Sequence, residues 1–220
     1  TGVEELYAVL AEPGELRAGF PYFHRVWRAL LWWDGMRPER VTLKDAYLPE
    51  SRIVRLVGAT PSETPLAVAT KAMHNAVPHN QNDVGVIVLH AGGETFICDP
   101  ERGVYDQYKI HGRYNVPFAG SYGHSVPRIG GVEQSAGPSF EGEILEVDVA
   151  GEAKHVEMRI ERAYDIPELA VAHRALTVTP EGEVEVADTF TFSSDPKPVE
   201  EAFVTWLDTT VDGARAVMQG

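Results

Sequence analysis

The stretch from residue 73 to residue 88 gathers side chains that can bind a metal, move a proton or hold a carboxylate. The side chains of this kind are His74, His79, Asn80, Asn82 and Asp83. They stand directly ahead of an apolar run that predicts a strand. Polar groups are costly to bury without partners, and irregular segments held by a rigid scaffold commonly carry sites. We therefore expect residues 79–85 to form the functional centre.

One chemistry open to this cluster is metal binding, which needs about three His, Asp, Glu or Cys ligands from separate segments. The candidates are His79, Asp83, Asp99 and His124. Asp99 closes a strand antiparallel to the one that follows Asp83, so a hairpin returns it beside the cluster, and His124 lies on a later cationic segment. These segments are expected to converge. Gln81, by contrast, is a poor ligand, and spacing alone leaves a metal-free cluster open.

The other chemistry is acid–base work. His79 is the natural candidate because the ordinary pKa of histidine lies near neutral pH. Asn80 and Asn82 would orient a substrate carboxylate through hydrogen bonds. The alternative is that His74 and His79 are hydrogen-bonded structural histidines.

The elements that must position these groups are mostly strands. After residue 40 the apolar pattern alternates, which predicts strands at 51–57, 66–71, 83–90, 94–98, 142–149, 155–160, 176–179, 183–192 and 202–206. Turn residues at 91–94 and 180–182 join neighbouring strands. The fold class is therefore mainly β, a two-layer antiparallel β-sandwich over 41–220. A further strand at 214–218 ends abruptly, so the sandwich is expected to be cut short.

A helical segment precedes the sandwich. Apolar residues recur at helical spacing over 3–36, so residues 1–40 are expected to be a cap on the sheet or the end of a helical domain. The chain opens without Met and without a signal peptide, which indicates a piece of a longer protein.

A long segment, 99–140, carries the other candidate groups. It holds seven glycines and four prolines, and residues 101–131 carry six basic side chains against Glu101 and Asp106. This sign reverses that of the whole chain, which has a net charge of -14. Its aromatics argue for an ordered functional loop, the alternative being a solvated loop with scattered cations.

Composition excludes some partners. The acidic balance repels nucleic acid and anionic membranes, and no run approaches the roughly 20 apolar residues of a membrane span. The single cysteine, Cys98, is expected to be a buried structural thiol. Arg174 and Asp188 are expected to pair inside the sandwich.

Three ordered motifs carry a family resemblance. They are HNQNDVG at 79–85, FICDPERGVY at 96–105 and SYGHSVPRIGG at 121–131. Together they resemble the C-terminal domain of the heparinase II/III-type polysaccharide lyases, which include alginate and oligoalginate lyases. Shorter segments at 163–165, 173–174 and 186–190 resemble the same domain, so the match covers roughly 45–206.

The resemblance implies a site between this sandwich and an N-terminal (α/α) toroid, whose end residues 1–40 would be. It identifies His79 with a catalytic histidine of the family's HNHND motif. The motif's second histidine ligates a structural zinc together with groups that correspond to Asp99 and His124. Here Gln81 stands in that place, so zinc would be held by Asp99, His124 and, at most weakly, Gln81.

The resemblance further implies β-elimination across a uronic acid residue of a glycan. The site must neutralise the carboxylate, abstract the C5 proton and protonate the departing O4 oxygen. The expected binding residues for an anionic poly- or oligosaccharide are Asn80, Asn82, Arg102, Tyr105, Arg113 and Tyr122. The parent protein would be periplasmic or extracellular, and the chain without its toroid is expected to lack most lyase activity.

Two further hypotheses stay open. The first is a non-catalytic carbohydrate-binding or structural sandwich, which Gln81 favours. The second is a small metal-dependent β-barrel enzyme, which would need a metal at His79, Asp99 and His124 without any helical domain.

Overall fold

The computed structural model describes residues 42–100 and 109–219, and the chain divides between Leu43 and Lys44. The predicted helical segment at 1–40 lies outside the described residues, as do the candidate binding residues Arg102 and Tyr105. Within the described part of the chain, no helix has the length and apolar character needed to cross a membrane.

The first sheet has five antiparallel strands that follow one another in chain order. They are β1 (Ala46–Leu48), β2 (Ile53–Ala59), β3 (Pro65–Lys71), β4 (Ile87–Ala91) and β5 (Glu94–Ile97). Alternation directs Val54 and Leu56 of β2 inward and leaves their neighbours more exposed. The β4–β5 turn uses Gly92 and Gly93 at positive φ, which glycine adopts without steric cost.

The second sheet has four antiparallel strands in the order β10-β9-β8-β7. These are β7 (Glu143–Asp148), β8 (Lys154–Arg159), β9 (Leu169–Val178) and β10 (Val184–Phe192). The β9–β10 turn is closed by a 3.1 Å bond from Gly182 N–H to Thr179 O. Exposure alternates residue by residue along β10, as expected for a strand with one face on the core.

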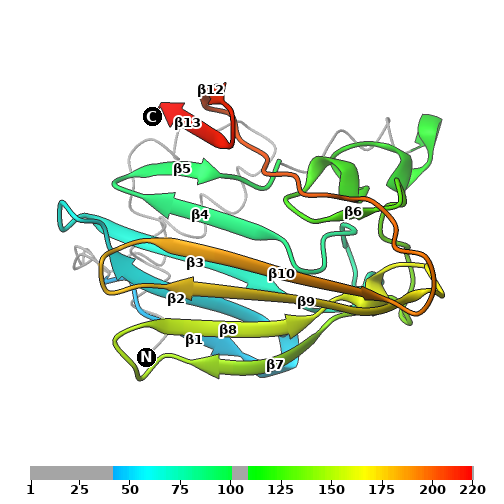
Figure 1. Cartoon of the computed structure of the whole chain (residues 1–220), viewed down its shortest axis with the longest axis horizontal. Coiled ribbons are helices and arrows are strands. Elements are labelled where there is room, and N and C mark those ends of the chain that lie inside the picture. Colours follow the sequence, from blue (N-terminus) through cyan, green and yellow to red (C-terminus); the bar gives the residue numbers. More distant parts are fainter. Residues whose placement is uncertain (1–41, 101–108, 220) are drawn as a thin grey trace, which may run out of the picture. The chain divides into compact units, whose positions relative to one another are not determined.

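The two sheets pack face to face and enclose the core (Figure 1). Leu56 and Val68 of the first sheet and Met158 and Leu176 of the second are almost fully buried. Each such side chain contributes about 1.5–3 kcal/mol of burial free energy. Gly58 marks a close approach, because a Cβ there would lie 2.7 Å from Val178 Cγ1.

The described part also contains short elements. They are η3 (Pro49–Ser51), η4 (Arg113–Asn115), η5 (Ser121–Gly123), β6 (Arg128–Ile129), η6 (Glu161–Ala163), β11 (Val199–Glu200), β12 (Asp208–Asp212) and β13 (Arg215–Gln219). β6 pairs with β11, and β12 pairs with β13. The described part of the 99–140 segment therefore contains helical turns and a short strand.

The predicted β-sandwich is confirmed, with corrections at three strands. The strand predicted at 83–90 begins at Ile87, because the preceding residues form a tight turn. The strand predicted at 176–179 begins at Leu169, since its small and polar residues hid the pattern. The strand predicted at 202–206 is absent from that stretch, where the backbone of Val204 bonds to Cys98 and Ser125 instead of to a neighbouring strand.

Candidate functional site

Asp83, Asp99 and His124 come together from three segments of the chain. One potential ligand atom of each lies within 4.8 Å of the others. Asp83 and His124 are buried, and the Asp99 side chain is 35% exposed. We call these residues the carboxylate–histidine cluster. All three are among the metal candidates that the sequence suggested.

Asp83 is placed by the end of β3 and by a turn. Gly85 N–H donates to Lys71 O at 2.7 Å, and Val86 N–H donates to Asp83 O at 3.0 Å. Gly85 has a φ of 81°, and a Cβ at this position would lie 3.2 Å from Ile160 Cγ2. Glycine is needed here for both reasons. The turn thus fixes the carboxylate at the edge of the core.

Asp99 and His124 are positioned in the cluster by different elements. Asp99 follows β5 by two residues, and a 2.9 Å bond from Cys98 N–H to Val204 O anchors this exit. Cys98 is a buried free thiol, as predicted. His124 follows η5 and donates its backbone N–H to Ser121 O at 3.1 Å. The predicted return of Asp99 beside Asp83 through the β4–β5 hairpin is therefore present.

The imidazole of His124 is fully buried, yet among the described residues neither ring nitrogen has a hydrogen-bond partner of good geometry. Nδ1 lies 3.3 Å from Asp99 Oδ1. Leaving a buried polar group unpaired costs about 1–3 kcal/mol, so native structures rarely do it without a ligand, an ordered water or a functional reason. The ring is therefore poised to accept a ligand.

Lys71 supplies positive charge to the cluster. Its ammonium Nζ forms an ion pair with Asp83 Oδ1 at 2.6 Å. Burial raises the pKa of the Asp83 carboxyl above its ordinary value, and the Lys71 ammonium partly offsets this effect. The two carboxylates and one imidazole of the cluster thus lie beside one ammonium.

The donor set of the cluster fits a divalent cation. Carboxylate oxygen and imidazole nitrogen are ordinary ligands for zinc and for harder divalent ions. The amide nitrogen of Gln81 donates to Phe118 O at 2.7 Å. Asp83, a carboxylate with a ligand atom within 4.8 Å of those of Asp99 and His124, is a better third ligand than the amide of Gln81.

His79 lies outside the carboxylate–histidine cluster and has an exposed side chain. It occupies a turn closed by a 3.0 Å bond from Asn80 N–H to Val77 O, with Pro78 preceding it. Its φ of 62° is in the left-handed region, which few non-glycine residues adopt. Such conformations persist where the surroundings enforce them, and they concentrate at functional sites.

Asn80 and Asn82 are buried and tie their segment to the 113–119 segment. Asn80 O accepts a hydrogen bond from Arg113 Nη2. Asn82 N–H donates to Ala119 O at 2.9 Å, and its side-chain nitrogen donates to Gln134 O at 3.1 Å. These contacts hold the backbone on both sides of Gln81.

A cavity of about 510 Å³ opens beside Asn82. Its walls include Asn82, Tyr114, Pro117, Tyr122, Glu133 and Gln134. The Tyr122 side chain is 59% exposed, and the Arg128 guanidinium carbon lies 5.1 Å from its ring centroid. Arg113 lies 5.6 Å from the ring centroid of Tyr114. The volume lies within the usual range for small-ligand sites.

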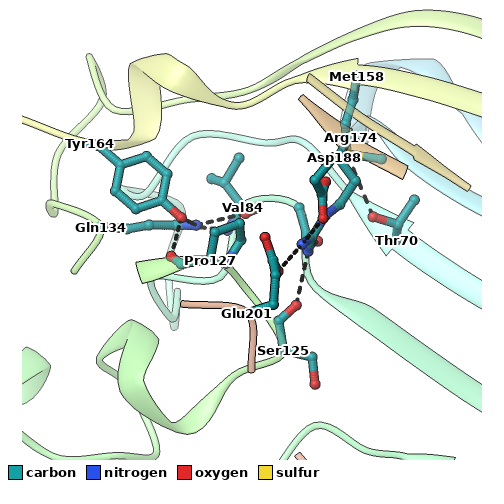
Figure 2. Close-up of polar contacts among 11 residues, drawn as sticks. Thr70, Val84, Ser125, Pro127, Gln134, Met158, Tyr164, Arg174, Asp188 and Glu201 are labelled. Carbon is teal, nitrogen blue, oxygen red and sulfur yellow. Dashed lines mark hydrogen bonds and ion pairs between the residues drawn. The ribbon is translucent and has the colours of Figure 1, made fainter. Parts of the chain in front are cut away.

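Arg174 of the second sheet lies in a polar network with Asp188, Glu201 and Ser125 (Figure 2). Its Nε and Nη2 donate to the two Asp188 oxygens at 2.8 and 2.7 Å, as the sequence predicted. Nη2 also donates to Glu201 at 2.7 Å, and Nη1 donates to Gly85 O at 2.8 Å and Ser125 O at 3.2 Å. All five guanidinium donors are used. Arg174 therefore joins the backbones next to Asp83 and His124.

Gln134 is a second support that sequence reasoning missed (Figure 2). Its Oε1 accepts from Val84 N–H at 2.9 Å, and its Nε2 donates to Val84 O at 2.7 Å. Tyr164 OH donates to Pro127 O at 2.5 Å and accepts from Gln134 Nε2 at 3.4 Å. The side chain thus pairs with the turn as a strand backbone would. Nothing in the local pattern around Gln134 signals this pairing.

Comparison with solved structures finds heparinase and heparan sulfate lyase folds. The chain is similar to a heparinase III gene product with a TM-score of 0.60 and 12% identity, over 86% of this chain and 30% of that chain. It is similar to another heparinase III structure with a TM-score of 0.55 and 16% identity, over 80% and 27% of the two chains. For the heparan sulfate lyase HepC from Pedobacter heparinus, the values are 0.54 and 13%, over 89% and 29%.

These likenesses show a shared fold with a domain found in heparan sulfate lyases. The chain spans about 30% of the length of the first structure. No protein-family model and no curated protein matches the sequence.

Proposed function

We propose that this chain is the sandwich domain of a polysaccharide lyase that cleaves uronic-acid-containing glycans by β-elimination. The observation that carries the proposal is the fold likeness to heparinase III over 86% of the chain. The position of His79 adds to it, because this side chain is exposed directly beside the buried Asn80.

His79 is the residue of this chain that acts on the reacting sugar. Its imidazole either abstracts the C5 proton or neutralises the carboxylate as negative charge builds there. The left-handed turn after Pro78 directs the side chain outward, while the Arg113 contact to Asn80 O holds the backbone. The remaining acid, base and carboxylate-binding groups come from a helical toroid domain of the same protein.

The cavity beside Asn82 contacts the glycan. Tyr114 and Tyr122 offer aromatic faces for sugar rings, and Asn82 and Glu133 offer hydrogen-bonding groups for hydroxyls. The described wall of this cavity contains no Lys or Arg. The carboxylate or sulfate groups of the glycan therefore meet cations outside it, such as the exposed Lys109 and His111.

The carboxylate–histidine cluster holds a divalent cation, with Asp83, Asp99 and His124 as ligands. Zinc is the first candidate because imidazole and carboxylate both suit it. A bound cation there ties together three segments near the glycan-binding loops and so serves structure. The parent protein acts on glycans in the periplasm or outside the cell.

Lyase activity is tested on the parent protein that includes the toroid. Heparan sulfate, alginate and an uncharged glucan are the substrates, and the ultraviolet absorbance of the unsaturated uronate product is the readout. We expect cleavage of a uronic-acid glycan and a loss of at least about 100-fold in kcat in His79→Ala. His90→Ala, whose imidazole contacts Thr95 at 3.0 Å in the β4–β5 hairpin, is the matched control. Equal activity of His79→Ala and His90→Ala would remove His79 from the mechanism.

A second candidate is a carbohydrate-binding domain without catalysis. The contact of Gln81 with Phe118 O favours it, because the amide that stands in place of an expected ligand is committed to loop structure. Calorimetric titration of heparan sulfate oligosaccharides into the chain, together with the cleavage assay, separates the candidates. Binding that Tyr122→Ala weakens, with no cleavage by the parent protein, would favour this second function.

A further inference from the structure

We propose that Lys71 is a built-in counter-cation of the carboxylate–histidine cluster, and that its ammonium and a divalent metal ion are alternative partners of Asp83 Oδ1. This inference rests on the cation site of the proposed function, but it does not depend on glycan cleavage. Lys71 would then set how tightly the cluster binds a metal.

The first support is the contact at Asp83. Lys71 Nζ forms an ion pair with Asp83 Oδ1 at 2.6 Å, and the described residues offer this buried oxygen no hydrogen-bond donor besides that ammonium. A buried carboxylate requires a positive partner, because an isolated buried charge is costly. The ammonium therefore occupies the place that a bound cation would take at this oxygen.

The second support is that the Lys71 ammonium does not satisfy every group of the carboxylate–histidine cluster. Asp99 Oδ1 and the buried His124 Nδ1 face each other at 3.3 Å, and within the described part of the chain neither ring nitrogen of His124 has a hydrogen-bond partner of good geometry. Lys71 thus balances one carboxylate of the cluster but not the histidine. A divalent ion would satisfy Asp83, Asp99 and His124 together, since each has a ligand atom within 4.8 Å of the others.

The third support is that the Lys71 side chain can turn its ammonium away from Asp83 into solvent. Its backbone is fixed at the end of β3 by pairing with Ile53 and by the bond from Gly85 N–H. Its side chain is 25% exposed, and a lysine stem is flexible enough to turn its ammonium toward water. Metal binding can therefore expel the ammonium without moving the strand.

Two consequences follow for metal affinity. In the wild-type chain, a metal ion must displace a close ion pair before Asp83 can coordinate it, so binding is weaker than the three ligands alone would give. Removing the ammonium while keeping the apolar stem, as in Lys71→Met, lifts this competition. The expected gain in affinity is about 10- to 100-fold, which corresponds to the loss of one competing ion pair.

The test is calorimetric titration of Zn²⁺ and, separately, Mn²⁺ into chelator-treated wild type, Lys71→Met and Lys154→Met. Lys154 is the matched control because it forms a 2.7 Å ion pair with Asp45 and has a similar side-chain exposure of 23%. We expect tighter binding in Lys71→Met, no change in Lys154→Met and loss of the gain in Lys71→Met/Asp83→Asn. Unchanged or weaker binding in a folded Lys71→Met, or no metal binding by either protein, would overturn the proposal.

A second measurement uses the wild-type chain, so it stands even if Lys71→Met does not fold. Lysine acetylation by acetic anhydride is followed by mass spectrometry with and without Zn²⁺. If metal expels the ammonium, Lys71 becomes several-fold more reactive when Zn²⁺ is present, while Lys154 does not change. Equal or lower reactivity of Lys71 in the presence of bound Zn²⁺ would contradict the exchange.

Discussion

Two neighbouring buried polar regions differ in how completely their groups are paired. Around Arg174, all five guanidinium donors have acceptors, and Asp188 and Glu201 balance the charge. Around His124, an equally buried ring has two nitrogens without a hydrogen-bond partner of good geometry among the described residues. A buried network in which every polar group is hydrogen-bonded is stable as it stands, whereas an incompletely bonded one needs a bound ion, water or ligand to satisfy its remaining groups. The Arg174 network is therefore structural, and the carboxylate–histidine cluster is the candidate site.

The largest expected effect comes from breaking the complete network. Arg174→Met leaves two carboxylates and two carbonyls without their partner, so the free energy of unfolding should fall by about 3–5 kcal/mol. Denaturant-induced unfolding measures this loss. Arg52→Met is the control, because Arg52 pairs with Glu141 at 2.6 Å but its side chain is 38% exposed. The control should lose about 1 kcal/mol or less. Equal losses in the two variants would contradict the claim that the buried Arg174 network stabilises the fold more than the exposed Arg52 pair.

A smaller loss is expected at Gln134. Gln134→Leu keeps much of the volume but leaves the N–H and C=O of Val84 unpaired in the interior. We expect a loss of about 2 kcal/mol in the free energy of unfolding, together with weaker metal binding because the adjacent Asp83 loses its support. A stable variant with unchanged metal affinity would show that the Asp83–Val86 turn does not need Gln134.

A substitution in the carboxylate–histidine cluster should change the stability much less than Arg174→Met does. Without metal, His124→Leu removes two ring nitrogens that have no hydrogen-bond partner among residues 42–100 and 109–219, and it introduces an apolar side chain, so the free energy of unfolding should change by no more than about 1 kcal/mol. Unfolding in the presence of a chelator tests this. A loss as large as that of Arg174→Met would mean that the imidazole already has its partners in the metal-free protein.

A further effect concerns pH. Burial, together with the nearby Asp188 carboxylate, raises the pKa of Glu201 from 4.5 to about 7, against the opposing pull of Arg174. Because the folded state binds this proton more tightly, its contribution to stability is complete below about pH 4.5 and is lost as pH rises through about 7. Glu201→Gln should flatten the fall in unfolding free energy across this window. An unchanged slope would mean that Glu201 titrates normally.

Much of the fold and part of the site could be predicted from the sequence, because both depend on local patterns. Strand alternation predicted the sandwich, and the turn at 91–94 implied that Asp99 returns beside Asp83. The Arg174–Asp188 pair also follows from local order, because these residues face each other in the β9–β10 register. The role of His79 and the glycan-binding residues stays a prediction.

The parts that escaped prediction depend on distant contacts. Lys71 ends an ordinary strand, and only the Asp83–Val86 turn brings the carboxylate to its ammonium. Gln134 pairs with Val84 across 50 positions, in a segment with no recognisable pattern. The expected ligand role of Gln81 was weak for chemical reasons, and its amide contact with Phe118 gives a structural reason as well.

The most direct test of the account is the stability of the wild-type chain and His124→Leu with and without Zn²⁺. With Zn²⁺ at about 100 times its Kd, the free energy of unfolding of the wild type should rise by about 2.7 kcal/mol. His124→Leu should gain nothing, although it folds equally well in chelator. An equal gain in both proteins, or no gain in either, would contradict the assignment of the carboxylate–histidine cluster as a metal site.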